Sequence, residues 1–178
     1  MTSPKKYKNK YRNDTTRLAN WDYGNNASYF ITICTKDRIK YFGDIINKSG
    51  QNEMQLTELG KQAEKCAIAI PEHFPFVCVD DFIIMPDHVH LLFTISKTDD
   101  DNGNDNGNVG TQNFASLHFA SQHFASQQRC NRFGPQSKNV ASIIRGFKIG
   151  VTRYARENNI DFKWQSRFYD HVVRNSDE

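Results

Sequence analysis

The segment 76–95 constrains the fold of this chain more than any other. Two stretches in it, Phe76-Val-Cys-Val-Asp-Asp-Phe-Ile-Ile84 and His88-Val-His-Leu-Leu-Phe-Thr-Ile95, are rich in the β-branched and aromatic residues that favour strands. They are separated only by Met85-Pro86-Asp87, and Pro followed by Asp is typical of a tight turn. We therefore predict that the two stretches pair as an antiparallel hairpin.

Further strands and helices are predicted on both sides of this hairpin. The run Tyr29-Phe-Ile-Thr-Ile-Cys-Thr35 predicts a strand, and a loop containing Gly43 and Gly50 follows it. A first helix, with Thr57 as a cap and Pro71 and Pro75 ending it, is predicted from residues at helical spacing: Leu56, Leu59, Ala63, Cys66, Ala67 and Ile70. A second helix, ending at Asn158-Asn159, is predicted from the stripe Val140, Ile143, Ile144, Phe147, Val151 and Tyr154. Residues 168–173 predict a last strand.

The order of these elements is β-α-β-β-α-β, the ferredoxin-like arrangement. We therefore predict an α+β fold in which an antiparallel sheet has its first and third strands at the centre and its helices on one face. We expect a single domain over 28–178, preceded by a basic flexible arm over 1–27, which lacks apolar periodicity. We also expect a low-complexity loop insertion at 97–139, because this stretch is Gly/Asn-rich and then repeats Phe-Ala-Ser from Phe114, Phe119 and Phe124.

Composition excludes several classes of protein. No apolar run approaches the roughly 18 residues of a membrane span, and no apolar segment follows the basic N-terminus as it would in a signal peptide. The four cysteines, Cys34, Cys66, Cys78 and Cys130, form no C-x-x-C pair and indicate reduced thiols. We predict a cytoplasmic protein with no membrane partner.

Charged residues are segregated along the chain, although the net charge is only +3. The arm carries basic residues between Lys5 and Arg12 without an acid, and a second basic zone extends from Lys138 to Arg174. A phosphate-binding face would have this pattern, and we predict that Lys148, Arg153 and Arg167 contact nucleic-acid phosphates. A solvated tail and a solvated helix face would also have it, so composition alone leaves both interpretations open.

His88 and His90 are the candidate metal ligands. Side chains alternate along a strand, so both imidazoles project from one face while Val89 points into the core. Two imidazoles this close can coordinate one cation, and its affinity would fall at acid pH because the ligands must be neutral. The alternative is two polar side chains on a half-exposed strand. The spacing identifies neither metal nor reaction, because cupin-like, hydrolase and deaminase sites also use such pairs.

A series of motifs in the right order resembles the HUH family of single-strand DNA nucleases (His, bulky hydrophobic, His), and within it the REP-associated tyrosine transposases. The motifs cover nearly the whole chain outside 97–139. They are Trp21-Asp-Tyr23, Tyr29–Thr35 with Phe42-Gly43, Ile84-Met-Pro-Asp-His-Val-His-Leu-Leu92, Ile143-Ile-Arg-Gly-Phe-Lys148 and Trp164-Gln-Ser-Arg-Phe-Tyr-Asp-His-Val-Val-Arg174.

This resemblance implies binding of single-stranded or hairpin DNA and metal-assisted strand cleavage in DNA transposition and recombination. It implies that His88 and His90 hold a divalent metal, Mg²⁺ or Mn²⁺, which polarises the scissile phosphate. In such proteins a tyrosine attacks the phosphorus, leaving a 5′-phosphotyrosine and a free 3′-hydroxyl. A homodimer is compatible with the family, whose members include dimers and monomers.

The resemblance also bears on the nucleophile. Relatives carry it on a helix after the last strand, in a Tyr-x-x-x-Asn/Gln pattern whose amide residue can supply a third metal ligand. By this register the present sequence, which ends at Glu178, lacks both, so whether it is an enzyme stays open. Tyr154, with Asn158 four residues later, imitates the pattern and is the fallback nucleophile. Its place on the apolar stripe favours a buried Tyr instead.

Two other classes of function stay open. A non-catalytic nucleic-acid-binding module would present aromatic and basic groups of the sheet to a single strand, and a chelator would not weaken its binding. A metal hydrolase acting on small molecules would need a deep pocket with further carboxylates around the histidines.

Overall fold

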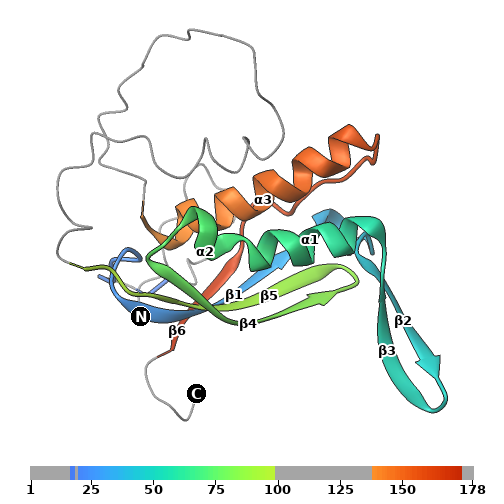
Figure 1. Cartoon of the computed structure of the whole chain (residues 1–178), viewed down its shortest axis with the longest axis horizontal. Helices are drawn as coiled ribbons and strands as arrows, with labels where there is room; N and C mark the ends of the chain where they lie inside the picture. The colour runs from blue at the N-terminus through green and yellow to red at the C-terminus, as the bar shows by residue number, and fades with distance from the viewer. Residues whose placement is uncertain (1–16, 19, 99–137, 174–178) are drawn as a thin grey trace, which may run out of the picture.

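The computed structural model describes residues 17–18, 20–98 and 138–173 and shows an α+β fold (Figure 1). The 4-stranded antiparallel sheet consists of β1 (Ala27–Cys34), β4 (Val77–Met85), β5 (His88–Ile95) and β6 (Tyr169–Val173). A separate hairpin consists of β2 (Gly43–Lys48) and β3 (Gln51–Leu56). The helices are the 3-10 segment η2 (Lys36–Arg38), α1 (Glu58–Ile68), α2 (Ile70–His73) and α3 (Val140–Glu157).

The sheet has the strand order β4-β5-β1-β6, so β1 and β5 are central, as predicted for the first and third strands of the expected arrangement. All the pairings are antiparallel, and they align Thr32 of β1 with His90 of β5 on one side and with Tyr169 of β6 on the other. The tight turn at Pro86-Asp87 joins β4 to β5, as the sequence predicts.

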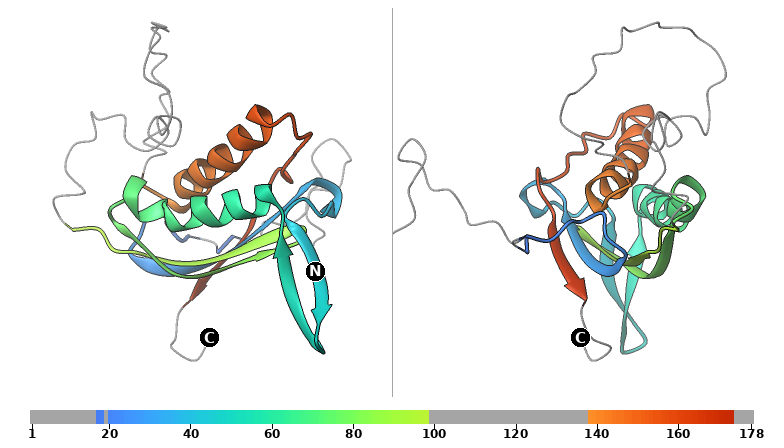
Figure 2. Two further views of the ribbon diagram at one scale, coloured as in Figure 1. Left: turned by 45° about the vertical axis from the view of Figure 1, so that its right-hand side comes forward. Right: turned by 90° about the vertical axis from the view of Figure 1, so that its left-hand side faces the viewer.

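The two long helices pack on the same face of the sheet (Figure 2). Alternate strand residues are buried beneath them, among them Tyr29, Ile31, Ile33, Val89, Leu91 and Phe93. The helices contribute Leu59, Ala63, Ala67, Ile143, Phe147 and Val151 to this core. We call the other side of the sheet the open face, because no helix of the described chain covers it. The intervening residues of β1 and β5 project there.

The helix ends have the caps that their sequences predict. Thr57 precedes α1, and its Oγ1 accepts a hydrogen bond from the Gly60 amide at 3.1 Å. Asn139 precedes α3 and forms a reciprocal capping box with Ser142, at 2.9 and 3.0 Å. Asn158 caps the end of α3, where the sequence predicts the helix to stop.

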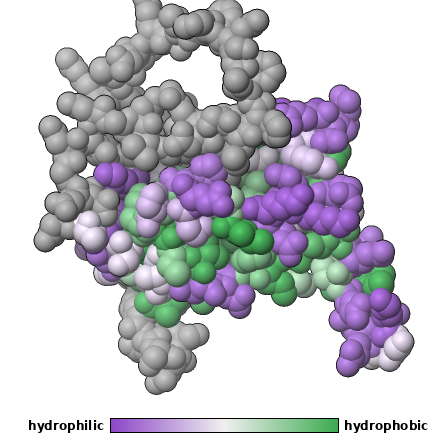
Figure 3. Space-filling model, viewed as in Figure 1, coloured by the Kyte–Doolittle hydropathy of each residue, from purple (hydrophilic) through white to green (hydrophobic). Residues whose placement is uncertain are grey.

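The predicted loop around Gly43 and Gly50 is instead the β2–β3 hairpin. Ser49 and Gly50 both have positive φ, 55° and 86°, which matches the twist of a two-residue hairpin turn. The prediction was wrong because the strands are mostly exposed and polar and therefore lack the buried alternation that identifies a strand. Figure 3 shows the hydrophilic residues gathered at the tip of this hairpin.

Two other boundaries differ from the predictions. The first helix breaks after Ile68, and Pro71 lies at the start of α2, where proline is tolerated because its missing amide hydrogen has no helical partner. The end of the predicted arm packs on the domain, since Tyr23 is buried and its hydroxyl accepts from the Leu18 amide at 2.8 Å. The rest of the arm and nearly all of the predicted insertion, with its Phe-Ala-Ser repeat, lie outside the described residues.

No helix in the described ranges has both the length and the apolarity to cross a membrane.

Candidate metal centre and nucleic-acid interface

His88 and His90 converge on the open face of the sheet. Their Nε2 atoms are 3.1 Å apart, and the ring planes are nearly perpendicular, at 84°. Two nitrogens bound to one cation at about 2.1 Å, with an angle of about 90° between them, would be separated by about 3.0 Å. The pair therefore fits adjacent positions in the coordination shell of a single ion.

Asp87 fixes the orientation of His88. Its Oδ1 lies 2.6 Å from His88 Nδ1, and since an ionised carboxylate can only accept, the imidazole donates from Nδ1. The neutral ring then keeps its lone pair on Nε2, the atom that faces His90. A carboxylate behind a histidine in this way is the usual outer partner of a metal-binding imidazole.

Thr32 supports His90 from the neighbouring strand. Its Oγ1 lies 2.9 Å from His90 Nδ1, and a hydroxyl can donate or accept, so it permits either neutral tautomer. With Nδ1 accepting, His90 Nε2–H can donate to His88. With Nδ1 donating, the two Nε2 lone pairs face each other, an arrangement that a metal ion bound between them would stabilise. The Phe30 ring also stacks on His90, with centroids 5.2 Å apart.

The surroundings of His90 favour its neutral form. Burial lowers its pKa below the usual value, and the nearby charges of His88 and Arg38 lower it further. A neutral imidazole is the form that binds a metal, so these effects favour the form of His90 that can act as a ligand.

Side chains that could contact a nucleobase surround the pair. Ile83 and Tyr169 align with the row that contains Thr32 and His90, and they are 52% and 49% exposed. Phe30 and Leu92 form the next row of the open face. Aromatic and aliphatic groups beside polar ligands form a surface on which bases of a single strand can stack.

The predicted fallback nucleophile lies away from the histidines. Tyr154 is on α3, partly buried against the core on the helical side of the sheet, whereas the histidines face the open side. The Asn158 amide, which completes the imitated motif, donates to the Tyr154 carbonyl at 2.9 Å as part of the helix cap. Tyr169, by contrast, shares the open face with His90, two strands away.

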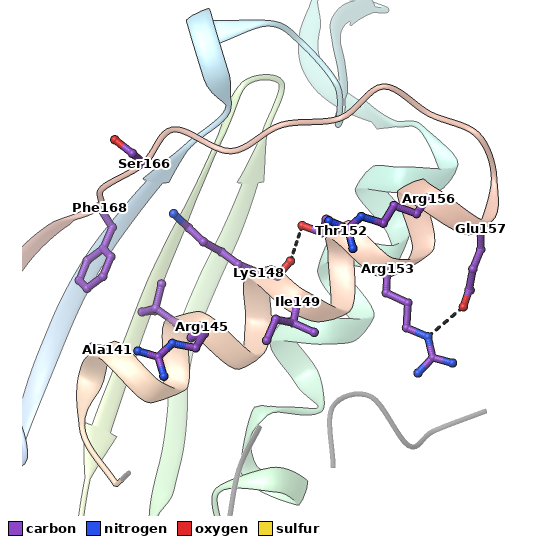
Figure 4. Close-up of a pocket in the computed structure, with 11 residues that line it drawn as sticks. Ala141, Arg145, Lys148, Ile149, Thr152, Arg153, Arg156, Glu157, Ser166 and Phe168 are labelled. Atoms are coloured by element: carbon purple, nitrogen blue, oxygen red, sulfur yellow. Dashed lines mark hydrogen bonds and ion pairs between the residues drawn. The ribbon is translucent and has the colours of Figure 1, made fainter. Parts of the chain in front are cut away.

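Two of the predicted phosphate contacts line a groove along α3. This groove, of about 580 Å³, includes Lys148 and Arg153 (Figure 4), and Arg167 is exposed between two further lining residues, Ser166 and Phe168. Arg153 pairs with Glu157 at 2.8 Å. Figure 4 shows Lys148 reaching from the helix towards β1. Its Nζ donates to the Gln165 carbonyl at 3.0 Å, and burial lowers its pKa to about 8.

Thr32 and Arg38 were not predicted from the sequence as parts of the site. Asp87 lies directly before His88 in the turn, a position that let the sequence suggest a carboxylate able to assist the metal. Arg38 comes from the β1–β2 connection, and its Nε donates to Asp87 Oδ2 at 2.9 Å.

Residues 17–18, 20–98 and 138–173 contain no group of three or more His, Cys, Asp or Glu side chains placed to hold a metal.

Known proteins provide a further comparison. No family model matches the sequence. A protein of uncharacterised function from Haemophilus influenzae is 36% identical over 159 residues, covering 89% of this chain and 77% of the relative. A candidate REP-associated tyrosine transposase from the same organism is 27% identical over 154 residues, covering 86% of this chain. The matched part spans 64% of that transposase.

Two solved structures are also similar. One is a REP-associated tyrosine transposase bound to a REP hairpin, with a TM-score of 0.49 and 15% identity, covering 90% of this chain and 64% of the other. The second is a candidate transposase from Deinococcus radiodurans, with a TM-score of 0.44 and 13% identity, covering 89% of this chain and 86% of the other.

Proposed function

Because this chain belongs to one family with the uncharacterised Haemophilus protein and is distantly related to the REP-associated tyrosine transposases, we propose that it binds single-stranded or hairpin DNA at a divalent-metal site. The observation that carries this proposal is the convergence of His88 and His90, whose Nε2 atoms are 3.1 Å apart. Asp87 and Thr32 support the two rings from behind. The strand order and the paired helices also favour the ferredoxin-like arrangement, with β2–β3 as an addition.

We assign the metal ligands to His88 and His90, and Mn²⁺ or Mg²⁺ as the ion, with Mn²⁺ better suited to nitrogen ligands. Such an ion would offset the negative charge on a phosphodiester oxygen. The protein's part is to hold both Nε2 lone pairs towards one point. With two protein ligands available in the described chain, oxygens of water and of the DNA phosphate would fill the other positions.

The open face is the proposed path of the single strand. Phe30, Ile83 and Tyr169 offer stacking surface next to the histidines. The α3 groove lies on the helical side, so Lys148 and Arg153 would contact a different part of the DNA, such as a hairpin stem. Arg167 would contribute a further phosphate contact there.

Strand cleavage is a separate part of the proposal, for which we assign no nucleophile among the described residues. A hairpin cleavage assay in Mn²⁺ with the wild type, Tyr154→Phe and Tyr169→Phe tests the two tyrosines considered above. A covalent protein–DNA adduct lost in one variant alone would identify that tyrosine.

The predicted cytoplasmic location fits DNA binding, and light scattering would test the predicted homodimer.

Fluorescence anisotropy with a hairpin oligonucleotide tests the DNA-binding proposal. We expect Mn²⁺ to strengthen binding, and EDTA or His88→Ala to abolish that gain. His171→Ala is the matched control, because His171 is an exposed histidine on the open face two strands from the pair, and it should keep the response to Mn²⁺.

A non-catalytic nucleic-acid-binding module is the second candidate function. The exposed Ile83 and Tyr169 favour it, because a stacking surface needs no metal. Affinity for the oligonucleotide that is the same in Mn²⁺, in EDTA and after His88→Ala would select this function over the first.

A further inference from the structure

The connection after β1 has an unusual backbone beside the histidine site. Asp37 and Arg38 both have left-handed conformations, with φ of 56° and 57°. Residues other than glycine adopt this conformation at a cost, because the Cβ atom crowds the backbone. Two such residues in a row persist only where the surrounding structure holds them in place.

Thr35 ties this connection to the β4–β5 turn. Its amide donates to the Asp87 carbonyl at 2.9 Å, and its buried hydroxyl lies 2.7 and 3.0 Å from the carbonyl oxygens of Ile39 and Asp87. The Phe42 amide donates to the Pro86 carbonyl at 3.0 Å. Arg38 is therefore anchored at both ends of its short segment, directly next to the turn that carries Asp87 and His88.

The Arg38 guanidinium is held in one orientation, but only some of its N–H donors form hydrogen bonds. Its Nε donates to Asp87 Oδ2 at 2.9 Å, and its Nη1 donates to Cys34 Sγ at 2.9 Å. The side chain is still 55% exposed, and in the described part of the chain these are its polar contacts. Since a guanidinium has five N–H donors, several remain for a ligand.

An ion pair whose arginine is more than half exposed is too weak to explain this arrangement. Such pairs contribute little net stability, whereas each left-handed non-glycine residue destabilises the folded chain. The Arg38–Asp87 pair alone therefore does not account for two left-handed residues in a row. Strain of this kind is typical of segments that hold a side chain for a ligand.

We propose that Arg38 binds the non-bridging oxygens of the DNA phosphodiester held at His88 and His90. The proposal rests on the proposed function and adds to it a phosphate-contacting residue outside the metal ligands. Arg38 Nε and His88 Nδ1 both contact the Asp87 carboxylate, so the guanidinium lies next to the pair. Its free donors form a planar fork, the geometry that matches two phosphate oxygens. Asp87 would then serve two residues, orienting His88 through Oδ1 and Arg38 through Oδ2.

The test compares Arg38→Gln and Arg38→Lys with Lys36→Gln. Lys36 lies in the same short segment and is also exposed, so Lys36→Gln removes one positive charge from this segment and leaves the Arg38 guanidinium in place. Anisotropy with a hairpin oligonucleotide in Mn²⁺ is measured over a range of KCl concentrations. We expect Arg38→Gln to lose about tenfold in affinity and its salt slope to fall by about 0.7 to 1. Arg38→Lys should lose less, and Lys36→Gln less than about twofold.

Two further measurements locate the contact. A single neutral methylphosphonate replaces each phosphate of the oligonucleotide in turn. At one position it should weaken binding to the wild type and have no effect on binding to Arg38→Gln. Mn²⁺ affinity without DNA, followed by electron paramagnetic resonance, should stay within about threefold of wild type, because Arg38 is not a ligand.

The outcomes separate this inference from the proposed function. If the wild type binds DNA in a metal-dependent way and Arg38→Gln loses no more affinity than Lys36→Gln, the Arg38 inference is wrong and the proposed function stands. A parallel loss of Mn²⁺ and DNA affinity would also overturn the inference, because Arg38 would then act through Asp87. Absence of metal-dependent DNA binding by the wild type would overturn both. Arg38→Lys keeps the charge and the long side chain, so the comparison holds even if Arg38→Gln fails to fold.

Discussion

Asp87→Asn should weaken metal binding although Asp87 is not a proposed ligand. In the wild type its two carboxylate oxygens accept from His88 Nδ1 at 2.6 Å and from Arg38 Nε at 2.9 Å. An asparagine has a single acceptor oxygen for these two donors, and its amide nitrogen would face one of them. Either the His88 tautomer loses its partner or the guanidinium does.

The expected magnitude follows from the first of these two bonds. Removing the outer partner of a metal-bound histidine costs about 10- to 100-fold in metal affinity, which is about 1.4–2.7 kcal/mol. Asn retains one acceptor, so we expect Asp87→Asn near the lower value and Asp87→Ala near the upper one.

Titration with Mn²⁺, following the free ion by electron paramagnetic resonance at pH 7.5, measures this change. Asp81→Asn is the matched control, because Asp81 is an exposed carboxylate on β4 whose Oδ1 accepts from the Phe82 amide at 2.8 Å. It removes the same charge and should leave Mn²⁺ affinity within about twofold. Wild-type affinity in Asp87→Ala would refute the idea that the carboxylate prepares His88 for a metal.

Three further predictions concern stability. Thr57→Ala removes the acceptor of the Gly60 amide and should lower the free energy of unfolding in urea by about 1 kcal/mol, whereas Thr57→Ser should not. Gly60→Ala should lower Tm although alanine favours helices by about 1 kcal/mol, because its Cβ would lie 2.1 Å from the Phe42 carbonyl oxygen; a higher Tm would contradict this. Lys148 has a pKa of about 8, lowered by burial from 10.5 in the unfolded chain, so the unfolded state binds more protons between these values and stability should rise with pH. Urea midpoints at about pH 7.5 and pH 9.5 should therefore differ less in Lys148→Met than in the wild type.

Much of the fold could be predicted because its central elements have long, regular patterns. β5 begins and ends where the sequence places it, and α3 ends at Glu157 with the predicted Asn158 as its cap. The β2–β3 hairpin could not be predicted in this way, since its side chains are mostly exposed and polar. Tyr23 was assigned to the arm because the few apolar residues around it, Trp21 among them, follow no helix or strand period, and only tertiary packing buries it.

In the candidate site, too, some features could be predicted from the sequence and others could not. The shared face of His88 and His90 follows from alternation along one strand, a local property of the sequence. The contacts of Thr32, Thr35 and Arg38 depend on strand pairing between segments about 50 residues apart, as in the Thr35–Asp87 bond with its separation of 52. The register in which these strands pair cannot be deduced from a single sequence. The left-handed backbone at Arg38 also has no local sign, because neither it nor the residue before it is a glycine.

The most direct measurement of the central claim is pulsed electron paramagnetic resonance of Mn²⁺ bound to the wild type, His88→Gln, His90→Gln and the double variant. If both imidazoles bind one ion through Nε2, the wild type should show couplings to two histidine nitrogens, each single variant to one, and the double variant to none. A wild-type spectrum without nitrogen couplings, or one that the double variant reproduces, would show that the metal binds elsewhere.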